Sequence, residues 1–139
     1  DESMNTKTAR RVFARDRYAE LSSIEIVEAA PGYCKARMQI EDKHLNSVDV
    51  VHGGALFTLA DLAFAVASNS HGQVALAINA HITYLRAVQT GVLYAVATEV
   101  DQPRKLGAYE VVISDQKDRT IATFSGMVYR KNQRIKDLE

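Results

Sequence analysis

HGGALFTLADLAFAVASNSHG, residues 52–72, is the stretch that decides the fold of this 139-residue chain. From Ala55 to Ala67 nearly every residue is apolar, and the apolar residues occupy all sides of a helical wheel. A helix that is apolar all round is a buried helix. Gly72 is well placed to end it, because glycine readily adopts the backbone conformation found after helix C-termini. We therefore predict one central, buried helix.

Strand patterns lie on both sides of this helix. Before it, the alternating segments Ile24–Ala30 and Tyr33–Ile40 flank a Pro31–Gly32 turn, which predicts a hairpin. A polar loop, residues 41–51, leads to the helix. After the helix the hydrophobic period changes to two, and four more strands are predicted: Val74–Leu85, Val92–Val100, Ala108–Ser114 and Ile121–Tyr129. The short connections between them favour antiparallel, meander-like pairing.

The predicted fold class is α+β, in the hotdog arrangement. An antiparallel sheet with one apolar face buries an all-apolar helix by curling around it. The pattern alone leaves open a sandwich in which the helix packs on a flat sheet. We expect a single domain over residues 18–131, preceded by an N-terminal helical extension, 1–17, and followed by a polar tail, 132–139. Residues from about Thr6 to Leu21 favour helix, and their basic side chains are interpreted as a solvated face.

Composition narrows the function classes. Seventeen basic residues offset seventeen acidic ones, so no global field favours nucleic acid or an anionic membrane. The single cysteine, Cys34, excludes an internal disulfide and fits a reducing compartment. No segment has the length and apolarity of a membrane span, and the N-terminus has no hydrophobic signal region. We expect a cytoplasmic enzyme or binding domain.

Asp61 lies in the middle of the apolar helix. Its neighbours at three and four residues, such as Phe57 and Ala65, carry no positive charge. Removing an unpaired carboxylate from water costs several kcal/mol or forces it to take up a proton. Either the helix exposes a thin polar face at Asp61, or the acid is held in a functional site.

His52, Gly53 and Gly54 stand where the helix is expected to begin. A helix N-terminus carries unpaired backbone N–H groups and a partial positive charge. Glycine there lets a ligand approach the backbone without a Cβ in the way. A carbonyl oxygen on the Gly53 N–H would be polarised, and the oxyanion formed during acyl transfer would be stabilised. A tight loop-to-helix turn is the alternative explanation of the two glycines.

With these segments together, the sequence resembles the hotdog-fold acyl-CoA thioesterases of the phenylacetate-degradation type, which include 4-hydroxybenzoyl-CoA thioesterases. The resemblance spans roughly Tyr18 to Arg130. It rests on residues 52–72, on INAHITYLRAV at 78–88 and on GAYEVVI at 107–113. Its most specific part is the His-Gly-Gly step with the acid eight positions beyond the first glycine.

The resemblance implies roles for four residues. Gly53 would donate its backbone N–H to the thioester carbonyl, and Asp61 would be the catalytic carboxylate. Asn46 would orient the carbonyl or the water, and His52 would shape the substrate end of the loop. The family also implies a homotetramer built as a dimer of dimers, with Gly53 and Asp61 of each site contributed by opposite chains.

Further residues are predicted to bind the substrate. The phosphates of coenzyme A are expected to contact basic side chains at the edge of the site. Polar residues on one face of the strand at 74–85 could line a channel for its pantetheine arm. Simple exposure to solvent explains the basic residues and the polar strand residues equally well. Ala87 follows Arg86 where the family often has proline. The residues predicted to contact substrate or coenzyme A are Gly54, Asn79, His81, Thr83, Arg86, Arg104, Lys105 and Gly107.

The sequence thus favours an acyl-CoA thioesterase in which Asp61 is the nucleophile or the general base. His44, His71 and His81 show no metal-ligand spacing, and no G-x-S-x-G, G-x-G-x-x-G or P-loop motif occurs, so we expect no metal and no cofactor beyond the coenzyme A of the substrate. The acyl group stays open between aryl-acetyl and medium-chain. A hotdog enoyl-CoA hydratase or dehydratase and a non-catalytic acyl-CoA sensor are the alternatives.

Overall fold

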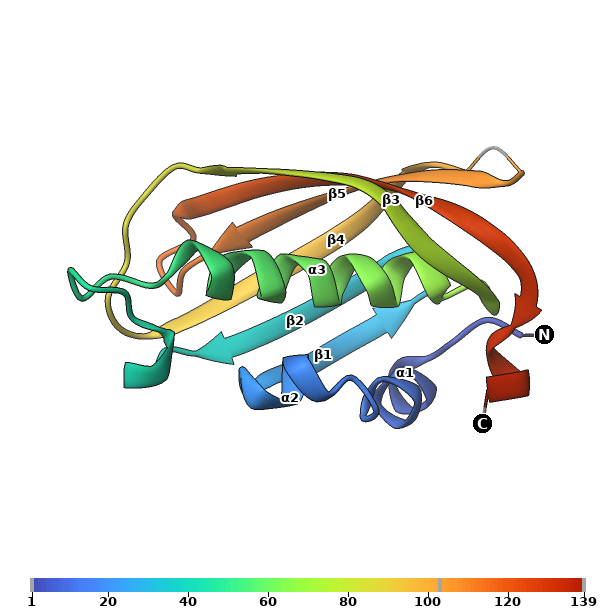
Figure 1. Cartoon of the computed structure of the whole chain (residues 1–139), viewed down its shortest axis with the longest axis horizontal. Coiled ribbons are helices and arrows are strands. Elements are labelled where there is room, and N and C mark those ends of the chain that lie inside the picture. The colour runs from blue at the N-terminus through green and yellow to red at the C-terminus, as the bar shows by residue number, and fades with distance from the viewer. Residues whose placement is uncertain (1, 103, 139) are drawn as a thin grey trace.

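A curved antiparallel sheet wraps around one long helix (Figure 1). The computed structural model describes residues 2–102 and 104–138. The central helix, α3, contacts strands in every part of the sheet. The flat-sheet alternative is therefore wrong, and the predicted wrapping is confirmed. The elements are α1 (Thr6–Phe13), α2 (Arg17–Leu21), β1 (Ile24–Ala30), β2 (Tyr33–Gln39), a 3₁₀ turn (Asp42–His44), α3 (Gly53–Asn69), β3 (Gln73–Tyr84), β4 (Val92–Asp101), β5 (Leu106–Ser114), β6 (Thr120–Arg134) and a second 3₁₀ turn (Ile135–Leu138).

The strand order is β1-β2-β4-β5-β6-β3, with every neighbouring pair antiparallel. The predicted meander holds for β4, β5 and β6 but is wrong for β3, which pairs with β6 at the edge of the sheet and not with β4. Because the sheet curls around α3 and places β5 and β6 between β3 and β4, the connection 85–91 joins β3 to β4 by passing across the N-terminal end of α3 (Figure 1). Hydrogen bonds from Leu85 N to Ile121 O and from Val51 N to Val88 O, each 2.9 Å, hold this connection in place.

The core lies between α3 and the concave face of the sheet. Phe64 of α3 packs its ring 5.4 Å from Phe124 and 5.8 Å from Tyr109, measured between centroids. Gly126 leaves room for this ring, since a Cβ there would lie 2.8 Å from Phe64 Cζ. The predicted alternation of β2 is confirmed, because the side chains of Cys34, Ala36 and Met38 are all buried. Among the described residues, no helix is long and apolar enough to cross a bilayer.

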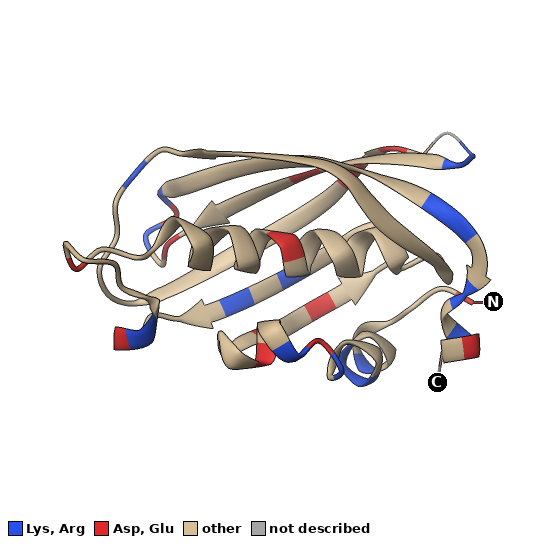
Figure 2. Ribbon diagram, viewed as in Figure 1, with Lys and Arg blue, Asp and Glu red and all other residues tan. Residues whose placement is uncertain are grey.

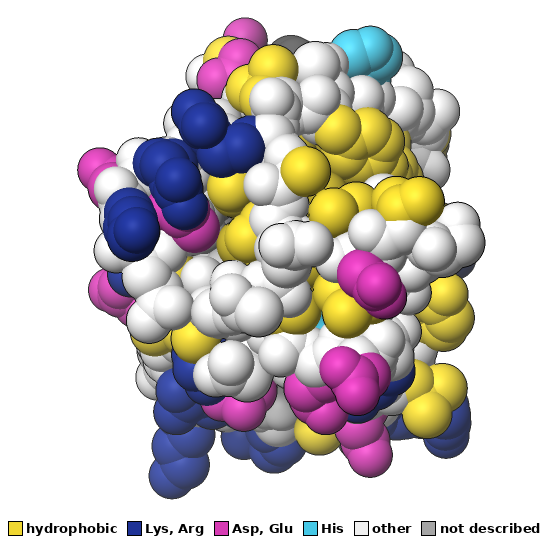
Figure 3. Space-filling view, turned by 90° about the vertical axis from the view of Figure 1, so that its left-hand side faces the viewer, with side chains coloured by type: hydrophobic (Ala, Val, Ile, Leu, Met, Phe, Trp, Pro, Cys, Tyr) yellow, Lys and Arg dark blue, Asp and Glu magenta, His cyan; other side chains and the backbone are white. Residues whose placement is uncertain are grey.

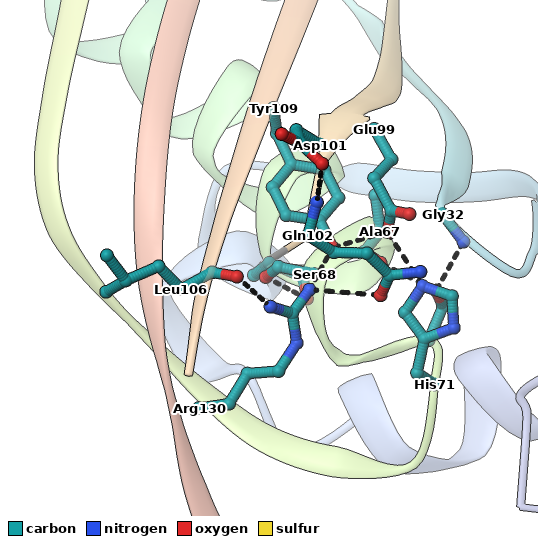
Figure 4. Close-up of polar contacts among 12 residues, drawn as sticks. Gly32, Ala67, Ser68, His71, Glu99, Asp101, Gln102, Leu106, Tyr109 and Arg130 are labelled. Carbon is teal, nitrogen blue, oxygen red and sulfur yellow. Dashed lines mark hydrogen bonds and ion pairs between the residues drawn. The ribbon is translucent and has the colours of Figure 1, made fainter. Parts of the chain in front are cut away.

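A partly buried polar network joins the β4–β5 end of the sheet to the C-terminal end of α3 (Figure 4). The Arg130 guanidinium donates to the Leu106 carbonyl and, over 3.0 Å, to the Tyr109 hydroxyl. That hydroxyl donates to Glu99 Oε2 over 2.7 Å, and His71 Nε2 lies 2.7 Å from the same oxygen. Burial, and then the Glu99 hydrogen bond, raise the pKa of Tyr109. The network fixes the sheet to the helix at the end opposite Gly53.

The N-terminal segment forms two helices where one was predicted. α1 ends at Phe13, and Asp16 starts α2 by accepting a hydrogen bond from Ala19 N over 3.0 Å at its Oδ1. An aspartate cap of this kind satisfies a backbone donor that a continuous helix would pair internally. Ala19 is buried beneath α2. The break therefore follows from Asp16 acting as a cap.

The predicted polar tail, 132–139, is ordered in the part that the structure describes. β6 continues to Arg134 and a 3₁₀ turn follows. Ile135 is buried and its N–H donates to Gly72 O over 2.9 Å. One apolar side chain in a polar segment is enough to dock it, and Gly72, with φ of +95°, supplies the acceptor just after α3.

Candidate active site

The N-terminus of α3 has one backbone donor that no described group satisfies. His52 caps the helix, and its Nδ1 accepts from Gly54 N over 2.8 Å. The His52 carbonyl accepts from Ala55 N over 2.9 Å and from Leu56 N over 3.2 Å. Among the described residues, the Gly53 N–H has no such acceptor. It is therefore the donor that this helix start can offer to a ligand.

Tyr84 packs directly against this helix start. Its hydroxyl donates to Gly53 O over 3.0 Å, and a Cβ added to Gly53 would lie 3.0 Å from the Tyr84 ring carbon Cζ and from its hydroxyl oxygen. The Tyr84 side chain, at the end of β3, thus leaves little room for a side chain at position 53. Sequence reasoning missed Tyr84, although it stands in the segment 78–88 on which the family resemblance rests.

Asp61 is half-buried in the middle of α3 (Figure 2). It shares a stripe of the helix with Gly54, Thr58 and Ala65, which the sheet leaves uncovered. Its carboxylate makes no hydrogen bond or ion pair with the residues that the structure describes. Burial, followed by the negative charge of Asp16 at the start of α2, raises the pKa of Asp61. A carboxylate held without a partner is suited to act on a ligand.

The two central groups do not meet within one chain. Gly53 and Asp61 are eight residues apart on α3, which is about 12 Å along the helix axis. A carbonyl oxygen bonded to the Gly53 N–H is therefore beyond the reach of the Asp61 carboxylate of the same chain.

Asn46 orders the loop before α3. Its Oδ1 accepts from Val48 N over 3.0 Å and from Val50 N over 3.2 Å, and its own N–H donates to Val50 O over 2.8 Å. The amide oxygen is therefore committed to the loop. The side-chain NH₂ group is the part that can donate to a ligand.

His81 and Thr83 face away from α3. They pair with Ser125 and Thr123, which are exposed on the outer face of the sheet, whereas the neighbouring Ile82 pairs with the buried Phe124. The pairing of β3 with β6 is irregular between Ala77 and Asn79, and Asn79 is exposed as well. Within one chain, these three polar residues are not brought to the N-terminus of α3.

The predicted basic residues separate into two groups. Arg86, whose N–H donates to Ile121 O over 3.2 Å, lies near the N-terminal end of α3, and a group of Lys and Arg side chains is visible on that face (Figure 3). Arg104 and Lys105 lie in the β4–β5 connection at the opposite end (Figure 1). The Lys105 ammonium donates to Asn132 over 3.0 Å.

Gly107 has a packing explanation. It is buried, and a Cβ there would lie 2.6 Å from Arg130 Nη2. Glycine at this position seats the Arg130 guanidinium, and the contact of Gly107 with coenzyme A stays a prediction. The described residues contain no group of three or more His, Cys, Asp or Glu side chains that could hold a metal ion.

Comparisons with known proteins converge on one family. The profile of the thioesterase superfamily matches residues 49–122. A protein of Archaeoglobus fulgidus that is named "Putative esterase" is 43% identical over 88% of this chain and 80% of its own length. The acyl-coenzyme A thioesterase PaaI of Escherichia coli is 34% identical over 89% of each chain. The solved structure of the E. coli PaaI protein, from the phenylacetic acid degradation operon, aligns with a TM-score of 0.88 and 33% identity, covering 92% of this chain and 94% of that one.

Proposed function

The chain belongs to the thioesterase superfamily of thioester hydrolases, and on that premise we propose that it cleaves acyl-coenzyme A to the free acid and coenzyme A. The observation that carries the proposal is that α3 presents a Gly53 N–H and an Asp61 carboxylate, neither of which has a partner among the described residues. The test is release of free thiol from a panel of acetyl-, hexanoyl-, octanoyl- and phenylacetyl-CoA. A protein that binds these compounds without turnover would be a sensor, and hydration of an enoyl-CoA would indicate a hydratase.

The proposed chemistry assigns one role to each group. The thioester carbonyl oxygen accepts from the Gly53 N–H, and this bond strengthens as negative charge develops on the oxygen. Asp61 either attacks the carbonyl carbon and expels the coenzyme A thiolate, leaving a mixed anhydride for water to cleave, or takes the proton of an attacking water. Asn46, through its NH₂ group, is proposed to orient the carbonyl or that water, and His52 to hold the helix start.

The proposed site requires two copies of the chain. Because Gly53 and Asp61 of one chain lie about 12 Å apart along the axis of α3, a thioester on Gly53 needs the Asp61 of a second copy. We propose a dimer that forms two such sites, and a tetramer built from two dimers. In a dimer with twofold symmetry, a contact between Gly53 of one chain and Asp61 of the other is repeated with the chains exchanged, so both sites form at once.

The edge of β3 is the surface proposed for this pairing. The other edge strand, β1, is covered, because Thr6 Oγ1 accepts from Ala29 N over 3.0 Å and the Arg10 Nε donates to Ile26 O over 3.0 Å. β3 is 12 residues long and ends the sheet, and α1 gives it no such cover. A long, apolar edge strand is an open template for another strand.

Charge placed on this edge is expected to separate the subunits. Leu76 and Ile78 are both 55% exposed on β3. We expect Ile78→Lys to give monomers in sedimentation equilibrium and to lower kcat by at least about tenfold, since each site loses its second chain. The matched control is Val100→Lys, at an exposed position near the end of β4. A wild-type monomer with full turnover would contradict both the dimer and the shared site.

Arg86 is proposed to contact a coenzyme A phosphate. It is exposed and lies in the connection 85–91, which passes the N-terminus of α3. We expect Arg86→Glu to raise KM by about fivefold while changing kcat less, because the phosphates take no part in the bond cleavage. Lys7→Glu, on the exposed surface of α1, makes the same change in net charge and is the control. Equal effects of the two variants on KM would remove Arg86 from the binding site.

A further inference from the structure

A cleft of about 380 Å³ lies beside the N-terminal end of α3, between that helix, α2 and the loop at 41–44. Its walls include Tyr18 and Leu21 from α2 and Gly54, Ala55 and Thr58 from α3. Volumes of about 300–1,000 Å³ are typical of small-molecule sites. Gly54, which lines the cleft, directly follows Gly53 at the start of α3.

Two large side chains are held exposed in this cleft. Tyr18 is 69% and Leu21 is 72% exposed, although both carry large apolar groups. They are three residues apart on α2 and share one face, while Ala19 on the other face is buried. Exposed apolar side chains gathered beside a cleft mark a binding surface more often than scattered ones do.

His44 fixes α2 to the start of α3. The ring Nδ1 accepts from Glu41 N over 2.9 Å, so in the neutral ring Nε2 carries the proton and donates to Ser22 O over 2.7 Å. The His44 carbonyl accepts from His52 N over 2.7 Å. This buried side chain thus connects the end of α2 to the residue that caps α3. The walls of the cleft are therefore positioned relative to Gly53 before any ligand binds.

The surroundings of Gly53 differ in chemistry on its two sides. On the side of the connection 85–91, exposed Arg86 offers positive charge, which suits the phosphates of coenzyme A, while the nearby Arg119 is paired with Asp115 over 2.7 Å. On the side of α2, the apolar part of the wall is formed by Tyr18, Leu21 and Ala55, and the loop before α3 adds polar residues, among them Lys43 and His52. A thioester held at Gly53 would point its two ends toward these two surfaces.

We propose that this cleft receives the acyl group of the substrate and that Tyr18 and Leu21 set the preference for bulky apolar acyl groups, aryl-acetyl or medium-chain. The proposal rests on the proposed function. Neither residue touches the reacting atoms, so both act on specificity. Residues 17–21 lie outside the part of the chain that matches the superfamily profile, 49–122, whereas the α3 wall of the cleft lies within it.

The test compares substrates of different acyl size. In the double variant Tyr18→Ala/Leu21→Ala, the ratio of kcat/KM for octanoyl-CoA to kcat/KM for acetyl-CoA is expected to fall about tenfold, as is the ratio for phenylacetyl-CoA. Val100→Ala, an exposed apolar residue near the end of β4, is the matched control and should keep both ratios. An unchanged thermal midpoint shows that the variants fold, which is expected because both side chains are exposed.

The outcomes separate this inference from the proposed function. Wild-type turnover with unchanged ratios in the double variant would overturn the cleft and leave the hydrolase in place. Absence of any wild-type turnover would overturn the hydrolase, and the cleft would then be tested by calorimetric binding. In that case a preference for octanoyl-CoA over acetyl-CoA that the double variant loses would support the cleft, and equal binding of the two compounds would overturn it.

Discussion

Asp61→Asn is expected to lower kcat for acyl-CoA hydrolysis by about 10³-fold or more, whichever of its two proposed roles Asp61 performs. The amide has nearly the shape of the carboxylate but is neither a base nor a nucleophile at neutral pH. The measurement is steady-state thiol release with the best substrate of the panel. Asp16→Asn is the matched control, because asparagine also caps helices well and Asp16 is the neighbouring acid. Turnover of Asp61→Asn near that of the wild type would remove Asp61 from the mechanism.

The same variant is expected to be at least as stable as the wild type. Burial raises the pKa of Asp61 in the folded state, so ionising the carboxylate costs folding free energy. That cost is absent below the ordinary aspartate pKa and grows as pH rises through the raised pKa. The variant should therefore match the wild type in acid and exceed it near neutral pH, by no more than about 1 kcal/mol, since Asp61 keeps contact with solvent. Thermal unfolding at several pH values measures this difference, and a variant less stable at neutral pH would contradict it.

The raised pKa also predicts the shape of the pH–rate profile. Both proposed roles need an ionised carboxylate, so kcat should fall on the acid side at a higher pH than an ordinary aspartate would give. Asp16→Asn should move this acid limb to lower pH, because it removes the nearby negative charge.

The central helix and the curled sheet around it were predictable, because their sequence pattern is compatible with only one arrangement. The all-apolar segment 55–67 required burial on every side, and a curled sheet provides that. The position of β3 was not predictable from loop length, because residues 85–91 are short enough for a hairpin yet cross the end of α3. Only the curl of the sheet decides whether β3 pairs with β4 in a hairpin or with β6 at the edge of the sheet. The docking of Ile135 was missed for a related reason, since its partner Gly72 is distant in sequence.

The candidate site shows the same division. Asp61 and Gly53 could be found from sequence because an acid in an apolar helix and glycines at a helix start are locally anomalous. Tyr84, Tyr18 and Leu21 carry no such local signal. Tyr84 reaches Gly53 across 31 positions of the chain, and the exposure of Tyr18 and Leu21 depends on how α2 docks. Gly107 shows why a glycine alone is an ambiguous signal, because a buried arginine needs the same residue type that a close ligand would.

The role of the Gly53 N–H can be separated from the shape of its residue by comparing Gly53→Pro with Gly53→Ala. Proline removes the donor and is tolerated at the first position of a helix, and His52, with φ of −60° and ψ of 136°, has the backbone that precedes proline. Alanine keeps the donor. Both substitutions add a Cβ, which would lie 3.0 Å from the Tyr84 ring, so this contact does not differ between the two variants. We expect kcat to be about 10²-fold lower in Gly53→Pro than in Gly53→Ala. Equal kcat values in the two variants would exclude this N–H as the oxyanion donor.

Mixing two inactive variants tests whether the site is shared between chains. If Gly53 of one chain works with Asp61 of its partner, a dimer of one Asp61→Asn chain and one Gly53→Pro chain has one site with both defects and one intact site. With random exchange half of the dimers are mixed, so an equimolar mixture should recover about a quarter of wild-type activity. If both groups acted within one chain, every site in the mixture would carry a defect and no activity would return. Recovery of activity on mixing thus distinguishes a shared site from an internal one even though neither parent variant turns over.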